Sequence, residues 1–214
     1  MTNAADPHAG QPVLHLGPKP DAARLTAILV HGRGASADDI LSLSREFQTT
    51  DVAYLAPEAA GHSWYPLSFL APIPRNEPWL TSALGAVASL ITSLSDQGVS
   101  PDRVALVGFS QGACLSLEFA ARNPRRYAAV IGLSGGLIGP PGTPRVYSGS
   151  LEGTPVFLGC SDVDAHIPVD RVRESAAVLR TMKGVVDDRI YPGMGHTVNA
   201  DEVAAVQKLL GGQP

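Results

Sequence analysis

The feature that most constrains this chain is the alternation of short apolar runs with longer segments of helical length. Runs rich in β-branched residues are predicted as strands over 25–31, 52–57, 104–109, 128–134, 155–160 and, partly alternating, 185–193. Helices are predicted over 37–47, 78–95, 113–123, 169–183 and 200–210. Most of the strands are continuously apolar, which is typical of parallel strands covered on both faces. The pattern predicts an α/β fold with a mainly parallel central sheet flanked by helices.

Length and composition fit one folded domain. The 214 residues include 44% hydrophobic and 17% charged side chains, as is usual for a globular chain. No repeat and no linker divides the sequence, so we expect a flexible N-terminal tail over 1–12 and a single domain over 13–214, without a separate cap domain. Cys114 and Cys160 lie in apolar segments and are expected to be reduced, packed thiols.

The charge pattern argues against several kinds of partner. The net charge is −4 and the arginines are scattered, which disfavours nucleic acid and anionic lipid surfaces. No apolar run approaches the ~20 residues that span a bilayer, and the N-terminus lacks the features of a signal peptide. We therefore expect a cytoplasmic protein without membrane insertion, a monomer or homodimer, that acts on a small molecule.

Two serines lie in Gly-x-Ser-x-Gly sequences. Ser110 is placed between a predicted strand and a predicted helix, which is the context of a nucleophile elbow. Ser134 also follows a strand, but the glycines and prolines of GGLIGPPG after it exclude a helix. We predict Ser110 as a nucleophile and Ser134 as a strand-end serine.

A nucleophilic serine needs a histidine to accept its proton and a carboxylate to orient that histidine. Of the two histidines after Ser110, we favour His196, in a glycine-rich loop before the last helix, as the base. His166 is expected to be exposed or to line a pocket. In the loop after the fifth predicted strand, Asp162 and Asp164 both qualify as the carboxylate, and their positions do not separate them.

The oxyanion that forms during acyl transfer needs two preorganised N–H donors. The backbone amide of Gln111, directly after the predicted nucleophile, is expected to be one of them. The glycine-rich segment HGRGAS, over 31–36, is expected to present the second from Arg33.

Four motifs, HGRGAS, GFSQGA, DAHIP and GMGHT, in this order resemble the carboxylesterase and lysophospholipase family that includes the acyl-protein thioesterases. The resemblance extends over about residues 25–210. It implies an α/β-hydrolase fold and hydrolysis of carboxylic esters, lysophospholipids or long-chain thioesters without a cofactor. It favours Asp164 over Asp162, because the family carries its triad aspartate in an Asp-x-x-Val-Pro pattern. It also supports the roles expected for Ser110, His196, Arg33 and Gln111.

The chain departs from the family pattern near the expected site. HGRGA stands where the family's thioesterases usually carry His-Gly-Leu-Gly-Asp, and Trp64-Tyr65-Pro66 stands in place of Trp-Phe-Asp. Trp64 and Tyr65 are expected to line a substrate pocket. With only the irregular loops 57–78 and 135–153 as cover, the sequence favours small or short-to-medium-chain esters, and thioesters, over a long acyl tunnel. A lysophospholipase or acyl-protein thioesterase is the alternative.

A dinucleotide-binding turn is a more distant alternative. Gly32-x-Gly34-x-x-Ala37 follows a predicted strand and opens a helix, and Glu58 follows about 20 residues later. This interpretation leaves DAHIP and GMGHT without a role.

A metal hydrolase and a non-catalytic binding module are both less well supported by the sequence. A metal hydrolase would gather His31, His62, His166 and the two aspartates, but their spacing matches no ligand motif, so we expect no metal and no cofactor. A non-catalytic hydrolase-like binding module typically lacks a triad residue, whereas this chain has a candidate for each.

Overall fold

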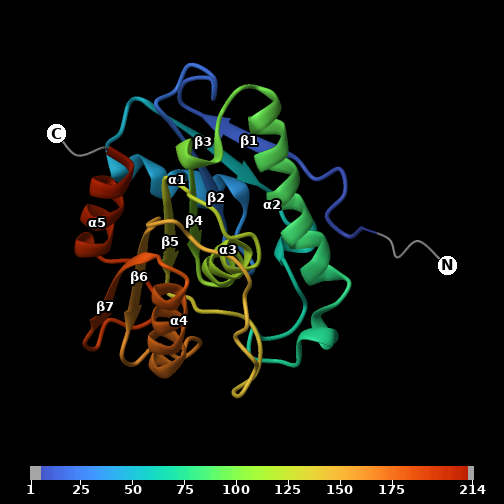
Figure 1. Cartoon of the computed structure of the whole chain (residues 1–214), viewed down its shortest axis with the longest axis vertical. Coiled ribbons are helices and arrows are strands. Elements are labelled where there is room, and N and C mark those ends of the chain that lie inside the picture. The colour runs from blue at the N-terminus through green and yellow to red at the C-terminus, as the bar shows by residue number, and fades with distance from the viewer. Residues whose placement is uncertain (1–5, 212–214) are drawn as a thin grey trace.

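The computed structural model describes residues 6–211, in which all strands belong to one sheet with helices on both faces (Figure 1). The strands are β1 (Val13–Leu16), β2 (Leu25–Val30), β3 (Val52–Pro57), β4 (Val104–Phe109), β5 (Ala129–Leu133), β6 (Pro155–Ser161) and β7 (Val185–Tyr191). The helices are α1 (Ala37–Ser44), α2 (Trp79–Asp96), α3 (Gln111–Arg122), α4 (Val169–Thr181) and α5 (Ala200–Gly211). None of the helices in this part of the chain is both long and apolar enough to cross a bilayer.

The sheet has the order β1-β3-β2-β4-β5-β6-β7, and β2 to β7 are all parallel to one another. The predicted α/β fold with a mainly parallel sheet is confirmed. The sequence pattern does not predict β1, which pairs antiparallel with β3, Val13 opposite Pro57. Its four residues are mostly exposed, so this edge strand carries little of the apolar pattern that marks the others.

Alternate residues of the central strands point to opposite faces of the sheet. In β2, Ala27 and Leu29 pack with α1 and α5, whereas Ile28 and Val30 pack with the residues of α2, α3 and α4. Each face therefore has its own helical cover, and this explains why β2 is buried at every position.

The segment from residue 6 to β1 is attached to the rest of the chain through His8. Residues 1–5, the first part of the expected flexible tail, lie outside the described residues. The backbone N–H of His8 donates to Ser82 Oγ at 2.9 Å, and its ring Nε2 lies 3.0 Å from the carbonyl oxygen of Trp64. His8 is buried, so this segment packs against α2 and the loop 57–78.

The carboxyl ends of the parallel strands meet at one edge of the sheet, which is where open α/β sheets place their ligands. The loops that follow β2, β4, β6 and β7 at this edge carry Arg33, Ser110, Asp164 and His196, respectively.

Candidate active site

Ser110 lies in a strained turn between β4 and α3. Its φ of 55° and ψ of −118° are unfavourable for a residue with a side chain. The turn is possible because the glycines on either side let the backbone segments come close. A Cβ atom on Gly112 would lie 2.0 Å from the carbonyl oxygen of Val30, and one on Gly108 would lie 2.2 Å from that of Gly112. The strand, turn and helix context predicted for Ser110 is therefore present.

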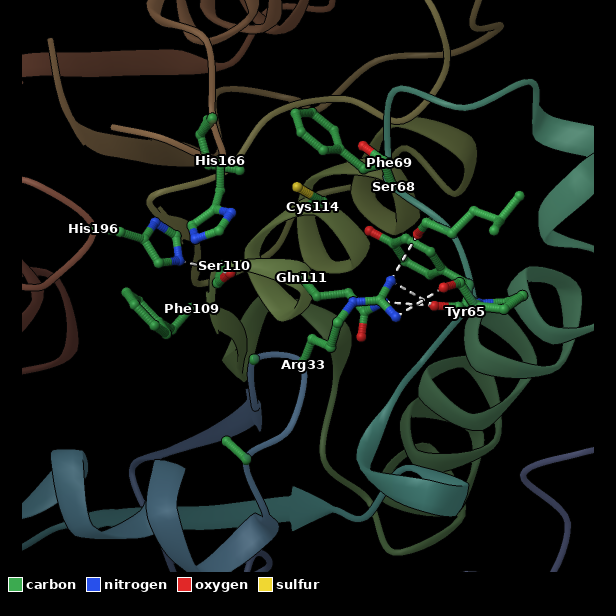
Figure 2. Close-up of a pocket in the computed structure, with 15 residues that line it drawn as sticks. Arg33, Tyr65, Ser68, Phe69, Phe109, Ser110, Gln111, Cys114, His166 and His196 are labelled. Carbon is green, nitrogen blue, oxygen red and sulfur yellow. Dashed lines mark hydrogen bonds between the residues drawn. The ribbon is translucent and has the colours of Figure 1, made fainter. Parts of the chain in front are cut away.

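Ser110, His196 and Asp164 form a continuous hydrogen-bonded chain. The Nε2 atom of His196 lies 2.9 Å from Ser110 Oγ, and its Nδ1 atom lies 2.7 Å from Asp164 Oδ2. In Figure 2, the dashed line between His196 and Ser110 marks the first of these contacts. The side chain of Asp164 is fully buried and that of His196 is 21% exposed. The arrangement is that of a nucleophile, a general base and a carboxylate that orients the base.

The surroundings of Asp164 keep it ionised. Burial opposes ionisation, but the hydrogen bonds that Asp164 accepts from His196 and from the backbone N–H groups of His166 and Ile167 outweigh it, so the pKa of Asp164 lies below its ordinary value. An ionised Asp164 favours the tautomer of His196 with its proton on Nδ1. Nε2 is then free to accept a proton from Ser110.

The sequence did not separate Asp162 from Asp164. In the structure, Asp162 contacts the backbone of the loop that carries His196 but does not contact the imidazole of His196. Its Oδ1 atom accepts from the backbone N–H of Gly193 at 2.7 Å. Nearby, Ser161 Oγ accepts from the backbone N–H of Gly195 at 3.1 Å. Both contacts attach the glycine-rich loop to the end of β6.

The backbone N–H groups of Arg33 and Gln111 are available to an oxyanion. Both residues line the cavity that contains Ser110, and neither N–H has an acceptor within residues 6–211. Gln111 is the first residue of α3, whose N-terminal dipole favours a negative charge at this position.

The side chain of Arg33 holds the loop 63–67 against this site. Its guanidinium donates to Ser63 Oγ at 3.0 Å and to the carbonyl oxygens of residues 65–67 at 2.7 to 2.9 Å. Figure 2 shows the bonds from Arg33 to the carbonyl oxygens of residues 65–67 as dashed lines. The arginine that replaces the family's leucine is therefore engaged by neutral oxygens of its own chain.

The side chain of Gln111 binds the same loop. Its Nε2 atom donates to the carbonyl oxygen of Tyr65 at 2.8 Å, and its Oε1 atom accepts from the backbone N–H of Trp64 at 2.9 Å. No local pattern signals these contacts, because they join segments that are far apart in the sequence.

Trp64 does not line the cavity, and the expectation that it would is wrong. Its ring is fully buried, 5.3 Å from the ring of His8 and 5.0 Å from that of His31 between centroids. Its indole N–H donates to the carbonyl oxygen of His31 at 2.9 Å. An aromatic ring with one donor is fully satisfied in such a core position. Tyr65, by contrast, is one of the cavity residues.

Two cavities, each of about 500 Å³, adjoin His196. The first contains Ser110 and is otherwise lined by Gly32, Arg33, Ala35, Tyr65, Pro66, Leu67, Ser68, Phe69, Phe109, Gln111, Cys114, His166, Ile167 and His196. The second lies beyond Phe109 and is lined by His31, Gly32, Ala35, Asp39, Ile40, Leu43, Phe109, His196, Thr197 and Val198. His166 is exposed, with its ring centroid 4.8 Å from that of His196.

The loop 135–153 contributes no residue to either cavity, although both long loops were expected to cover the site. It is held elsewhere by buried charged side chains. Glu118 Oε2 accepts from the backbone N–H of Ile138 at 2.9 Å, and Arg171 donates to the carbonyl oxygen of Leu137 at 2.8 Å. The segment with His166 and Ile167 lines the first cavity in its place.

The glycine-rich segment after β2 does not offer a dinucleotide site. Ser36 and Asp39 form a capping box at the start of α1. Glu58 Oε2 accepts from the backbone N–H of Ala37 at 2.8 Å, so a carboxylate of the chain already occupies the helix N-terminus that a phosphate would use. Residues 6–211 also contain no group of three or more His, Cys, Asp or Glu side chains suited to a metal ion.

The fold and the arrangement of these residues define a serine hydrolase with the α/β-hydrolase fold. More specifically, the chain belongs to the phospholipase/carboxylesterase family, whose family model matches residues 15–211. It is a hydrolase of carboxylic esters, as the sequence resemblance predicted.

Relatives and solved structures agree with this family. The chain is 26% identical to an acyl-protein thioesterase 1 from Yarrowia lipolytica over 90% of this chain and 93% of that protein. It is 24% identical to a probable carboxylesterase from Arabidopsis thaliana over 88% of this chain and 78% of that protein. A phospholipase/carboxylesterase structure from Dyadobacter fermentans is similar with a TM-score of 0.89 and 39% identity, covering 92% of this chain and 95% of that one.

Proposed function

We propose that this enzyme is a carboxylesterase that cleaves small or short-to-medium-chain esters through an acyl-enzyme on Ser110, and that it also accepts thioesters. One observation carries the proposal: the hydrogen-bonded path from Ser110 Oγ through His196 to the buried Asp164. Such a path turns a weakly nucleophilic hydroxyl into an effective one.

In the first step, Ser110 Oγ attacks the acyl carbonyl carbon while Nε2 of His196 takes the hydroxyl proton. Asp164 stabilises the imidazolium that results. The carbonyl oxygen becomes an oxyanion and accepts from the backbone N–H groups of Arg33 and Gln111. The loss of one such donor typically lowers turnover by ~10²–10³.

In the second step, His196 returns the proton to the leaving oxygen or sulfur, and the acyl-enzyme remains. A water molecule then attacks the acyl carbon while His196 takes its proton. The carboxylic acid leaves, and Ser110 regains its hydroxyl hydrogen from His196.

The two cavities suggest where the two halves of the substrate lie. The cavity with Ser110, Arg33 and Gln111 suits the acyl group, because the oxyanion donors belong to the carbonyl side of the bond. The cavity beyond Phe109 suits the leaving group, because His196 must reach the leaving atom. A volume of about 500 Å³ is in the usual range for a small-molecule site.

The test of the nucleophile compares the two serines that lie in Gly-x-Ser-x-Gly motifs. We expect Ser110→Ala to lower hydrolysis of a p-nitrophenyl ester by at least ~10³-fold and to abolish the acyl adduct seen by mass spectrometry of the intact protein. Ser134 is fully buried, and Ser134→Ala is expected to retain activity and the adduct. If Ser110→Ala keeps roughly a tenth of the activity, the assignment is wrong.

A lysophospholipase or acyl-protein thioesterase is the second candidate, supported by the names of relatives such as the one from Yarrowia lipolytica. Matched oxygen esters and thioesters, with acyl chains from acetyl to palmitoyl, separate the two. A maximum of kcat/KM at short chains favours the carboxylesterase. A rise toward palmitoyl thioesters favours the second candidate.

A further inference from the structure

Tyr65, which lines the acyl cavity, has a buried hydroxyl group without a partner among residues 6–211. Tyr65 is 1% exposed, and its hydroxyl oxygen is buried with no hydrogen-bond partner among residues 6–211. In Figure 2 the ring of Tyr65 reaches toward Cys114 on the wall of the cavity. Buried tyrosine hydroxyls normally have a partner, so this one is an unused donor for a ligand whose acceptor reaches it.

The adjacent thiol of Cys114 is a poor substitute for such a partner. Sulfur is a weak acceptor, and Cys114 Sγ already accepts from the backbone N–H of Gly136 at 3.5 Å. Burial raises the pKa of Cys114 to about 12 and raises the pKa of Tyr65 well above its ordinary value. The Tyr65 hydroxyl therefore keeps its proton and acts as a donor.

The distance from Ser110 to this hydroxyl corresponds to a short acyl chain. The backbone N–H of Cys114, in the first turn of α3, donates to the carbonyl oxygen of Ser110 at 3.0 Å, so the two residues are one helical turn, about 5 Å, apart. The Tyr65 hydroxyl lies beside Cys114, on the far side of the cavity from His196 (Figure 2). Phe69 and Ile167 provide apolar walls for the carbon chain of an acyl group that extends from Ser110 toward the Tyr65 hydroxyl.

The same cavity carries a positive charge that no carboxylate within residues 6–211 pairs with. All hydrogen bonds of the Arg33 guanidinium go to neutral oxygens. The buried carboxylate on this side of α3, Glu118, is paired with Arg122 at 2.7 Å. The surplus charge favours an acceptor with a negative charge.

From these observations we propose that the preferred acyl group carries an oxygen atom that accepts a hydrogen bond from the Tyr65 hydroxyl. Because Arg33 is positively charged, a carboxylate oxygen is favoured in this position. The inference rests on the proposed function and specifies its substrate class: half-esters of short dicarboxylic acids and esters of oxo acids. A plain alkyl chain in the same place leaves the buried donor unpaired, and sites of this kind discriminate against such substrates.

The test uses p-nitrophenyl pentanoate, p-nitrophenyl levulinate and mono-p-nitrophenyl glutarate, which have acyl chains of equal length. After correction for uncatalysed hydrolysis, we expect kcat/KM for levulinate and glutarate to exceed that for pentanoate by ~10-fold or more. Tyr65→Phe is expected to bring these ratios close to one. Tyr127→Phe removes a buried hydroxyl that donates to the carbonyl oxygen of Asn123, and it is expected to keep the wild-type ratios.

The outcomes distinguish this inference from the proposed function. If the wild-type enzyme hydrolyses pentanoate as well as the other two, or if its preference survives in Tyr65→Phe, the inference is wrong and the carboxylesterase proposal stands. If none of the three esters is hydrolysed, both proposals fail. A preference for levulinate alone supports the Tyr65 donor and contradicts the argument from the charge of Arg33.

A measurement on the wild-type enzyme alone covers the case in which Tyr65→Phe does not fold. The amides 4-oxopentanamide and glutaramate, whose first carboxyl group is neutralised, are expected to inhibit hydrolysis of p-nitrophenyl acetate competitively, with inhibition constants ~10-fold lower than that of pentanamide. Equal inhibition by all three amides contradicts the inference.

Discussion

Arg33 and Gln111 donate hydrogen bonds to the same atom, the carbonyl oxygen of Tyr65, and each bond is 2.8 Å long. The backbone N–H groups of these two residues are the proposed oxyanion donors. The loop 63–67 is therefore attached by side chains to both of the proposed oxyanion donors. A displacement of this loop would move both donors and change the wall of the acyl cavity at the same time.

Replacing Arg33 tests this attachment. Arg33→Met removes four hydrogen bonds to the loop 63–67 and is expected to lower kcat by ~10–100-fold, with a smaller change in KM. Arg33→Lys keeps the charge but not the forked geometry, so its kcat is expected to lie nearer to that of Arg33→Met than to wild type. Steady-state kinetics with p-nitrophenyl acetate measure both. Arg75→Met, which removes an exposed arginine nearby, is the control, and an unchanged kcat in Arg33→Met contradicts the prediction.

The two aspartates after β6 are expected to differ sharply in their effects. Asp164→Asn disturbs the orientation and tautomer of His196 and is expected to lower kcat by ~10⁴-fold. Asp162→Asn retains an oxygen that accepts from Gly193, so we expect kcat to fall by less than ~10-fold, and Asp162→Ala to lower it by up to ~10²-fold. Steady-state kinetics on one ester decide the order, and similar losses in the two Asn variants would contradict it.

The stability of the enzyme is expected to depend on pH through Glu202 in α5. Glu202 is fully buried; one carboxyl oxygen accepts from the backbone N–H of Asn199, and the other has no partner among residues 6–211. Burial raises the pKa of Glu202 to about 7. Because the folded pKa is above the unfolded one, this group's stabilising contribution is complete below about pH 4.5 and is lost as the pH rises through about 7.

Glu202→Gln removes this titration. The free energy of unfolding of the variant minus that of wild type is therefore expected to become more positive by about 2–3 kcal/mol from about pH 5 to about pH 8. Urea unfolding at the two pH values measures it. Glu46→Gln, at an exposed position, is expected to give no such change. A difference that is constant with pH, or that shrinks, is incompatible with the raised pKa of Glu202.

Both cysteines are expected to be unreactive in the folded enzyme. Cys114 and Cys160 are fully buried, and burial raises the pKa of each to about 12. Since the thiolate is the reactive form, iodoacetamide at about pH 8 should label neither residue in the native protein and both in urea. Mass spectrometry of the intact protein counts the labels. Rapid labelling of the native protein would contradict the expected burial of these thiols.

Much of the fold could be predicted from the sequence because its signals are local. The strand predicted over 104–109 has the same bounds as β4, and the helix predicted over 113–123 corresponds to α3, which begins at Gln111. The earlier start follows from the turn at Ser110, which passes directly into the helix. The edge strand β1 could not be predicted, because an exposed strand of four residues has no buried face to impose a pattern.

The chemical groups of the candidate site were also evident in the sequence, since a strand–serine–helix turn and a glycine-rich loop with a histidine are short motifs. The residues that these groups contact were not evident in the sequence. Asp162 and Asp164 are two residues apart, and only the path of the chain after β6 directs one to Gly193 and the other to His196. Trp64, a neighbour of the cavity residue Tyr65, is directed into the core between His8 and His31.

The sequence by itself therefore determined the alternation of strands and helices, the serine at the turn, and the hydrolase family. The tertiary structure alone decided which aspartate meets the histidine, that Arg33 and Gln111 hold one loop, and that the Tyr65 hydroxyl is buried without a partner among residues 6–211. The physical reason is the range of the interactions. Backbone propensity and apolar periodicity act over a few neighbouring residues, whereas these contacts join side chains whose distances depend on how the whole sheet and its loops pack.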